Sequence, residues 1–211
     1  MAVILSGLLL AACGMSSAST SATSAVAVAS PSSCAGRLHA TPSVVAPVGP
    51  GTGIPAGAPV DPAFSSFAVV SRAVMARGGT PTAAGFSFVH LQGYSGLVDL
   101  RTTDDRTYSS FEPSWWRYLY LPVVYTTAPT VEQAQSFLCF VLDPANQPVY
   151  VHDNFGNERT GVFVALYRYS AEGWPMRDAL AEADLYGAGI DAAQRQFLTE
   201  WATAHPPGVV P

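Results

Sequence analysis

The chain has 211 residues and a formal net charge of −5, and its ten basic residues are all arginines spread along the sequence. Non-specific nucleic-acid binding needs clustered positive charge, so this composition argues against it. The length allows one domain with a long tail, and the point where low-complexity sequence ends marks the boundary.

Residues 1–12 form a short apolar run that ends in small residues. The run is too short to cross a membrane and has the size of the apolar core of a signal peptide. The sequence Leu10-Ala11-Ala12-Cys13 resembles the lipobox of bacterial lipoproteins, which implies cleavage before Cys13 and lipid attachment to its thiol. We therefore expect an exported protein, anchored by lipid to the bacterial cell envelope. A buried N-terminal strand is the alternative.

Residues 13–61 consist mostly of Ser, Thr, Ala, Val, Gly and Pro and include no aromatic residue. Such a segment cannot bury enough apolar surface to offset its ordering entropy, so we expect a flexible linker. Residues 62–211 remain for a single domain, about 150 residues, which is enough for one full core.

Two further cysteines have alternative interpretations. Cys34 lies in the expected linker, and Cys139 lies in the apolar run Phe137-Leu138-Cys139-Phe140-Val141. Outside the cytoplasm the two can form a disulfide. The apolar surroundings favour the other interpretation, in which Cys139 is a free thiol that packs as a small hydrophobic side chain.

Residues 62–211 alternate short apolar runs with longer helical patterns, which is typical of a largely parallel sheet with crossover helices. Strands are expected at 67–70, 74–76, 96–100, 118–122 and 149–152. Helices are expected at 82–92, 130–142, 160–169, 175–186 and 191–204. Thr130 and Gln133 form a capping-box pattern at the start of the second helix, and Asp191 is the expected N-cap of the last.

The segment 148–161 carries the most chemical information. A strand runs into a loop and the loop into a helix, and such a junction aims backbone N–H groups and the helix dipole at an anion. Arg159 adds a planar guanidinium that matches two phosphate oxygens, and Gly156 lets the loop curl without a side chain in the cradle. The expected anion-binding residues are Asn154, Phe155, Gly156, Asn157, Glu158, Arg159 and Thr160.

This loop resembles that of the cysteine-dependent tyrosine and dual-specificity phosphatases, which have His, Cys, five residues and Arg, usually followed by Thr-Gly in the dual-specificity branch. The matching residues are His152, Gly156, Arg159, Thr160 and Gly161. Residues 76–82 resemble the family's early Arg-Gly/Ser-x-x-Pro segment, and residues 97–101 resemble its second-strand signature. The resemblance implies a central, mostly parallel α/β sheet flanked by helices, with structural roles for His152 and Gly161.

One departure from the family concerns the nucleophile, because Asp153 stands where the family has a cysteine. The family's thiolate is activated by the loop N–H groups and the helix dipole. A carboxylate has two oxygens that can accept the same N–H groups and pair with Arg159, so it can occupy the cradle in place of a phosphate. It is also a poorer nucleophile, and enzymes that form aspartyl-phosphates normally use a metal ion.

A second departure concerns the general acid. Many family members carry an aspartate in a mobile loop, and the corresponding segment here, residues 121–129, contains no acidic residue. Together with Asp153 this favours inactivity.

Two other groups of residues have competing interpretations. Asp104 and Asp105 are expected in an exposed acidic turn, with a cation site shared with Asp153 and Glu158 as the alternative. An aromatic cluster is expected to pack a core or an edge, with a substrate cleft as the alternative. The cluster consists of Phe111, Trp115, Trp116, Tyr118 and Tyr120.

The sequence therefore predicts a catalytically impaired, phosphatase-like lipoprotein with Asp153 in the nucleophile position beside Arg159. Its expected partners are a phosphorylated small molecule, lipid or protein and, through the anchor, a membrane, but no nucleic acid. We expect no cofactor and no metal. The alternatives are an active phosphoester phosphatase that uses the 152–159 loop, with Asp153 as nucleophile or as a position altered from cysteine, and a purely structural lipoprotein with a closed loop.

Overall fold

A five-stranded sheet forms the centre of the computed structural model, which describes residues 46–211. The strands are β1 (Ala68–Ser71), β2 (Met75–Gly78), β3 (Gly96–Asp99), β4 (Arg117–Tyr120) and β5 (Val149–His152). Their order is β1-β2-β5-β3-β4, with β1 antiparallel to β2 and all other neighbours parallel. The predicted mostly parallel α/β fold is confirmed.

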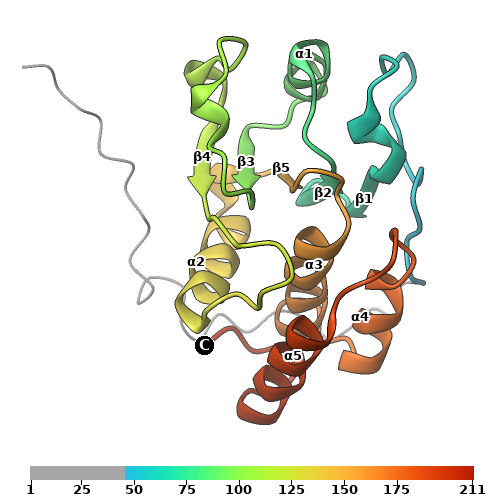
Figure 1. Cartoon of the computed structure of the whole chain (residues 1–211), viewed down its shortest axis with the longest axis vertical. Helices are drawn as coiled ribbons and strands as arrows, with labels where there is room; N and C mark the ends of the chain where they lie inside the picture. Colours follow the sequence, from blue (N-terminus) through green and yellow to red (C-terminus); the bar gives the residue numbers. More distant parts are fainter. Residues whose placement is uncertain (1–45) are drawn as a thin grey trace, which may run out of the picture.

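Helices cover both faces of the sheet. They are α1 (Ala83–Leu91), α2 (Val131–Leu142), α3 (Glu158–Ser170), α4 (Met176–Ala183) and α5 (Ala192–Ala204). Figure 1 shows α1 on one face, α2 and α3 on the other, and α4 and α5 packed beyond α3. Four short 3-10 helices were not predicted, namely η2 (Pro62–Ser66), η3 (Asp105–Thr107), η4 (Pro113–Trp115) and η5 (Pro144–Asn146).

Two central elements, β5 and α3, position the loop that joins them, residues 153–157. Every residue of β5 is buried, and so is every residue of α3 after Glu158. A strand covered on both faces and a helix surrounded by other elements both need continuous apolar sequence, which explains their patterns. The loop between them is therefore held at both ends by the best-packed elements of the domain.

The aromatic cluster packs a second core beneath α1. Phe111 and Trp116 make edge-on contacts with the ring of Phe86, and Trp115 stacks on His90. The cluster therefore packs against α1, as expected, and it does not line the cleft described below.

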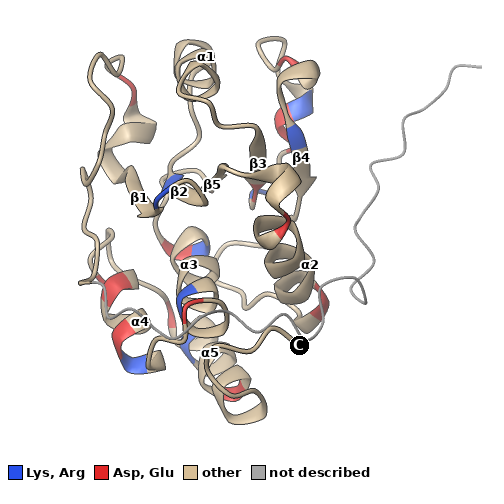
Figure 2. Cartoon of the chain, turned by 180° about the vertical axis from the view of Figure 1, so that it is seen from behind, with Lys and Arg blue, Asp and Glu red and all other residues tan. Residues whose placement is uncertain are grey.

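Basic and acidic residues alternate along the helices and do not form a patch of one charge (Figure 2). Figure 2 shows basic residues beside acidic ones along α3, α4 and α5. A buried pair joins α3 to α4, in which Arg168 Nε donates to Glu182 Oε1 at 3.1 Å. Within residues 46–211, no helix combines the length and the apolarity that crossing a membrane requires.

The folded part begins earlier than predicted. Val48 N donates to Glu182 Oε2 at 3.1 Å, and Tyr186 Oη donates to Val48 O at 2.7 Å. Two more backbone bonds run from Gly51 N to Phe67 O at 2.8 Å and from Val69 N to Thr52 O at 3.0 Å. The predicted boundary at residue 62 is therefore too late, because bonds made by the backbone leave no trace in composition.

Several predictions fall outside the described residues, namely the signal peptide, the lipobox with Cys13, and Cys34. Cys139 is buried in α2 and is disulfide-bonded. The favoured interpretation of Cys139 as a free thiol is therefore wrong, although its burial is as expected.

Candidate functional site

The loop between β5 and α3 lies at the carboxyl end of β5 and against the end of β2. Gly156 has a φ of +73°, and a Cβ there would come within 2.3 Å of the backbone carbon of Gly78. Both the left-handed backbone and this close approach require glycine. Glycine at position 156 thus lets the loop pack directly against the backbone of β2. This requirement adds to the curl of the loop, which was predicted from the sequence.

Asp153 forms the floor of the cradle and is only 1% exposed. Its Oδ1 accepts hydrogen bonds from Phe155 N at 2.9 Å and Gly156 N at 2.5 Å. Its Oδ2 accepts one from Thr160 N at 3.2 Å. The carboxylate therefore engages loop N–H groups in the position where the related phosphatases have a thiolate.

Arg159 is 5% exposed and lies beside this carboxylate. Its Nε is 3.8 Å from Asp153 Oδ2, which is an ion-pair distance but too long for a hydrogen bond. Its Nη1 donates to Val123 O at 3.3 Å, and its Nε has no hydrogen-bond partner among the described residues. Arg159 also lines the cleft described next, where its guanidinium can donate to an anion.

A cleft of about 390 Å³ opens above the loop. Its lining consists of Thr102, Val124, Tyr125, Asn154, Phe155 and Arg159. Phe155 and Tyr125 stand at its mouth, 67% and 56% exposed, and Tyr125 Oη donates to Glu158 Oε1 at 3.4 Å. Arg159 is the one charged side chain in this lining.

The side chains of the remaining predicted loop residues point in different directions. Asn157 turns its side chain away from the cleft, where Ser66 Oγ donates to its Oδ1 at 3.1 Å. Asn154 lines the cleft, and its carbonyl accepts from Thr80 N at 3.3 Å. The buried Oγ1 of Thr160 has no partner among the described residues. Only part of the predicted set therefore presents side chains to a ligand.

His152 ends β5 and is fully buried. Its Nε2 lies 2.9 Å from Asp105 Oδ2 and its Nδ1 lies 3.3 Å from Thr80 Oγ1. The Thr80 hydroxyl donates its proton to Asp153 O at 2.9 Å, so His152 Nδ1 must be the donor in their contact. Burial lowers the pKa of His152, but the charge and hydrogen bond of Asp105 outweigh it, and the pKa is raised.

Asp105 corrects an expectation, because it is fully buried instead of lying in an exposed turn. Arg101 explains the burial, since its Nη2 donates to Asp105 and its Nε donates to Asp99 Oδ1 at 3.1 Å. Ligand atoms of Asp99, Asp105 and His152 lie within 4.8 Å of one another, as in a metal site. The guanidinium of Arg101 and the protonated ring of His152 already balance the charge of the two carboxylates, however, so this group does not fit a cation.

Arg77 is a residue that the predicted site did not include, although it belongs to the matching segment 76–82. It is fully buried in β2, and its Nη2 donates to Gly156 O at 2.7 Å. The contact joins β2 to a loop that is distant in sequence, and only the match to the family segment could have pointed to it.

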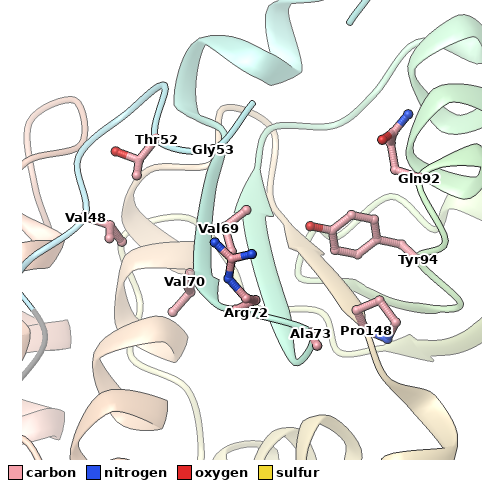
Figure 3. Close-up of a pocket in the computed structure, with 10 residues that line it drawn as sticks. All are labelled: Val48, Thr52, Gly53, Val69, Val70, Arg72, Ala73, Gln92, Tyr94 and Pro148. Atoms are coloured by element: carbon pink, nitrogen blue, oxygen red, sulfur yellow. The ribbon is translucent and has the colours of Figure 1, made fainter. Parts of the chain in front are cut away.

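A larger cavity of about 530 Å³ lies at the opposite ends of the strands. Figure 3 shows Arg72, Gln92 and Tyr94 among its lining, with Pro148 just before β5. Arg72 is exposed and is the one charged side chain in the lining. This cavity holds no nucleophile and no buried ion pair, so the smaller cleft over the loop is the candidate site.

The fold and this loop define a protein of the tyrosine and dual-specificity phosphatase class. A family model described as "DSP-PTPase phosphatase fused to NAD+ Kinase" matches residues 52–200. The chain belongs to this family, which confirms the resemblance found in the sequence.

Individual relatives agree. The chain is 34% identical over 99 residues to the probable chloroplastic NAD kinase 2 of rice, covering 44% of this chain and 10% of that protein. It is 30% identical over 139 residues to the dual-specificity phosphatase TpbA of Pseudomonas aeruginosa, covering 64% of this chain and 61% of TpbA. The chain thus spans between a tenth and about three fifths of these relatives' lengths.

A solved structure shows the same fold at lower identity. PTPMT1 in complex with PI(5)P superposes with a TM-score of 0.57 at 20% identity, covering 65% of this chain and 95% of that one. At this identity the likeness concerns the fold alone.

Proposed function

We propose that this domain is a catalytically impaired phosphatase that binds a phosphorylated or other anionic ligand without hydrolysing it. The observation that carries the proposal is the carboxylate of Asp153 in the nucleophile position, which accepts two N–H groups of the loop and one of the first turn of α3. The anion-binding parts around it, Arg159 and the start of α3, are in place.

The chemistry of Asp153 supports impairment. Both of its oxygens accept N–H groups, which lowers their reactivity toward a phosphate ester. Aspartyl-phosphate formation normally needs a metal to neutralise the phosphoryl oxygens. Among the described residues that line the cleft, none is a carboxylate that could hold such a metal.

The segment opposite the loop also supports impairment. Residues 121–129 reach the cleft through Val124 and Tyr125, and neither side chain can protonate a leaving group at neutral pH as a carboxylic acid does. Glu158 lies beside Tyr125, and an active enzyme built on this loop would have to use it as the acid.

The proposed ligand is a phosphorylated small molecule, lipid or protein whose anionic group enters the cleft toward Arg159. The guanidinium of Arg159, which lines the cleft, and the N–H groups at the start of α3 that have no acceptor supply donors for it. PTPMT1 is solved with the phosphoinositide PI(5)P, which gives one related example of such a ligand.

Hydrolysis is the direct test. The full chain should hydrolyse p-nitrophenyl phosphate no faster than buffer, because no thiolate is available. The assay compares the parent with Asp153→Ala and Asp153→Cys. Parent turnover that Asp153→Ala abolishes would make Asp153 a nucleophile and establish the alternative, an active phosphatase. Parent turnover that survives in Asp153→Ala would place the chemistry elsewhere.

Anion binding is measured by calorimetric titration of tungstate into the parent, Asp153→Ser and Arg159→Ala. Removing the carboxylate frees three N–H donors and removes one negative charge. Asp153→Ser should therefore bind tungstate about tenfold more tightly than the parent, or better. Equal affinity would reject a cradle filled by Asp153. If Arg159→Ala binds like the parent, the anion site is rejected, and no binding in any variant would favour the structural lipoprotein with a closed loop.

We also propose that the protein is exported and anchored to the cell envelope through lipid on Cys13. The disulfide at Cys139 supports an oxidising compartment, because disulfides persist there. The full-length precursor should therefore partition with membranes in its bacterial host, and Cys13→Ala should release it, as fractionation and immunoblotting would show. A full-length parent found in the soluble fraction would refute the anchor.

A further inference from the structure

Arg77 lies in β2 directly behind the loop and has no exposed surface. Its Nη2 donates to Gly156 O at 2.7 Å and to Asn157 O at 3.3 Å. Its guanidinium carbon lies 3.4 Å from the centroid of the Tyr186 ring. Among the described residues it forms no ion pair, and its Nε and Nη1 have no hydrogen-bond partner.

This arrangement is costly for a charged side chain. Burying a cation without a carboxylate in contact carries a large desolvation penalty, which two carbonyls and one ring offset in part. Burial lowers the pKa of Arg77 to about 10, so it remains charged at neutral pH. An apolar side chain would pack the same space without this penalty, which indicates that the contacts to the loop matter.

The direction of the loop peptides shows what the contacts do. In a trans peptide the C=O and N–H groups point in opposite directions. The Gly156 carbonyl accepts from Arg77 at 2.7 Å, and the Asn157 carbonyl accepts from Arg77 at 3.3 Å and from Gly161 N of α3 at 2.6 Å. The N–H groups of the same two peptides belong to Asn157 and Glu158, and they therefore point away from Arg77.

We propose that Arg77 is a positioning residue that holds these two carbonyls and thereby aims the N–H groups of Asn157 and Glu158 at a bound anion. The inference rests on the proposed function, because it needs an anion in the cradle. Asp153 accepts hydrogen bonds from the N–H groups of Phe155, Gly156 and Thr160. The N–H groups of Asn157 and Glu158 are therefore not occupied by Asp153.

The test uses the full chain with Asp153→Ser, in which affinity for tungstate is expected to be highest. Adding Arg77→Met should weaken tungstate binding about tenfold or more, because two donors lose their orientation. Adding Arg77→Lys should restore most of the affinity, because an ammonium can still donate to Gly156 O. Calorimetry measures the affinities, and urea unfolding measures the stability of each variant.

Arg168→Met is the matched control. Arg168 is also buried and lies over an aromatic ring, 4.3 Å from the centroid of Trp174, but it bonds Glu182 and Glu172 instead of the loop. Its replacement should cost stability and leave tungstate affinity unchanged. If Arg77→Met weakens binding no more than Arg168→Met does, Arg77 has a structural role alone and the proposal fails.

Amide NMR on Asp153→Ser with the native Arg77 covers the case in which Arg77→Met does not fold. Tungstate should shift the amide signals of Asn157 and Glu158, and binding without such shifts would overturn the proposal. Absence of tungstate binding in every variant would reject the anion cradle, and with it the role of Arg77. Binding that is insensitive to Arg77 would reject the role of Arg77 alone.

Discussion

At the scale of single residues, His152 links the loop to the charged group beneath it. It holds Asp105 through Nε2 and Thr80 through Nδ1, and both contacts suit a doubly protonated ring. The raised pKa of His152 means that the folded state binds this proton more tightly than the unfolded state. The stability of the domain therefore depends on pH near neutrality.

The direction of this dependence follows from the raised pKa. The contribution of His152 to stability is fully present below its unfolded pKa of about 6.5 and is lost as the pH rises through the folded value. The change Asp105→Asn removes the favourable charge, so burial should then lower the pKa of His152 and reverse this part of the pH dependence. Ring-proton NMR would measure the pKa of His152, and urea unfolding between about pH 5 and pH 9 would measure the pH dependence of stability.

The charges around His152 enter the same measurement. Asp99 raises its pKa further and Arg101 lowers it, so Asp105→Asn must be checked for an intact Arg101 to Asp99 contact. A parent His152 that titrates below 6.5, the ordinary value, would contradict the expected direction.

The residues of the site differed in how well they could be predicted. Asp153, Gly156 and Arg159 belong to one contiguous motif, so their neighbourhood followed from the sequence alone. Arg77 contacts the loop from β2, and Asp105 contacts His152 from η3, so both contacts join residues that are far apart in the sequence and that no spacing encodes. The burial of Asp105 depends on Arg101, a partner that composition cannot identify.

At the scale of elements, Asp153 acts on α3 as well as on the cradle. The N-cap residue Asn157 makes no capping bond with its side chain, and Thr160 N, in the first turn, donates to Asp153 instead. A carboxylate at this end also suits the helix dipole. The residue in the nucleophile position therefore satisfies part of the helix start, so variants there change stability together with binding.

The long elements were predictable because their own residues define them. The strand Val149–His152 was found with its observed bounds, and Thr130 and Asp191 begin α2 and α5 with capping boxes. Helix α3 starts two residues before its predicted start at 160, because Gly161 N already bonds Asn157 O. The 3-10 helices are single turns capped by Asp or Glu side chains, too short for a periodic signal.

At the scale of the whole molecule, the segment before residue 62 is tied to the site region. Tyr186 donates to Val48 O, and the same ring lies on the guanidinium of Arg77 behind the loop. Glu182 accepts from Val48 N while it pairs with Arg168. Residues 46–61 therefore complete the packing around α4, where a linker would contribute nothing.

Truncation distinguishes whether residues 46–61 are part of the folded domain or a flexible linker. A chain that begins at residue 62 loses the bonds to Glu182 and Tyr186 and the two backbone bonds beside β1, each worth about 1 kcal/mol. It should therefore be less stable by about 2 to 5 kcal/mol than a chain that begins at residue 46.

Urea unfolding of the two truncated chains gives the difference directly. Both truncated chains lack Cys13 and Cys34, so neither can form the disulfide of Cys139 and it does not affect the comparison. Tyr186→Phe in the longer chain removes only the bond to Val48 O and should reproduce part of the loss, because the ring stays on Arg77. Equal unfolding midpoints for the chains from 46 and 62 would show that the segment contributes no stability and would restore the predicted boundary.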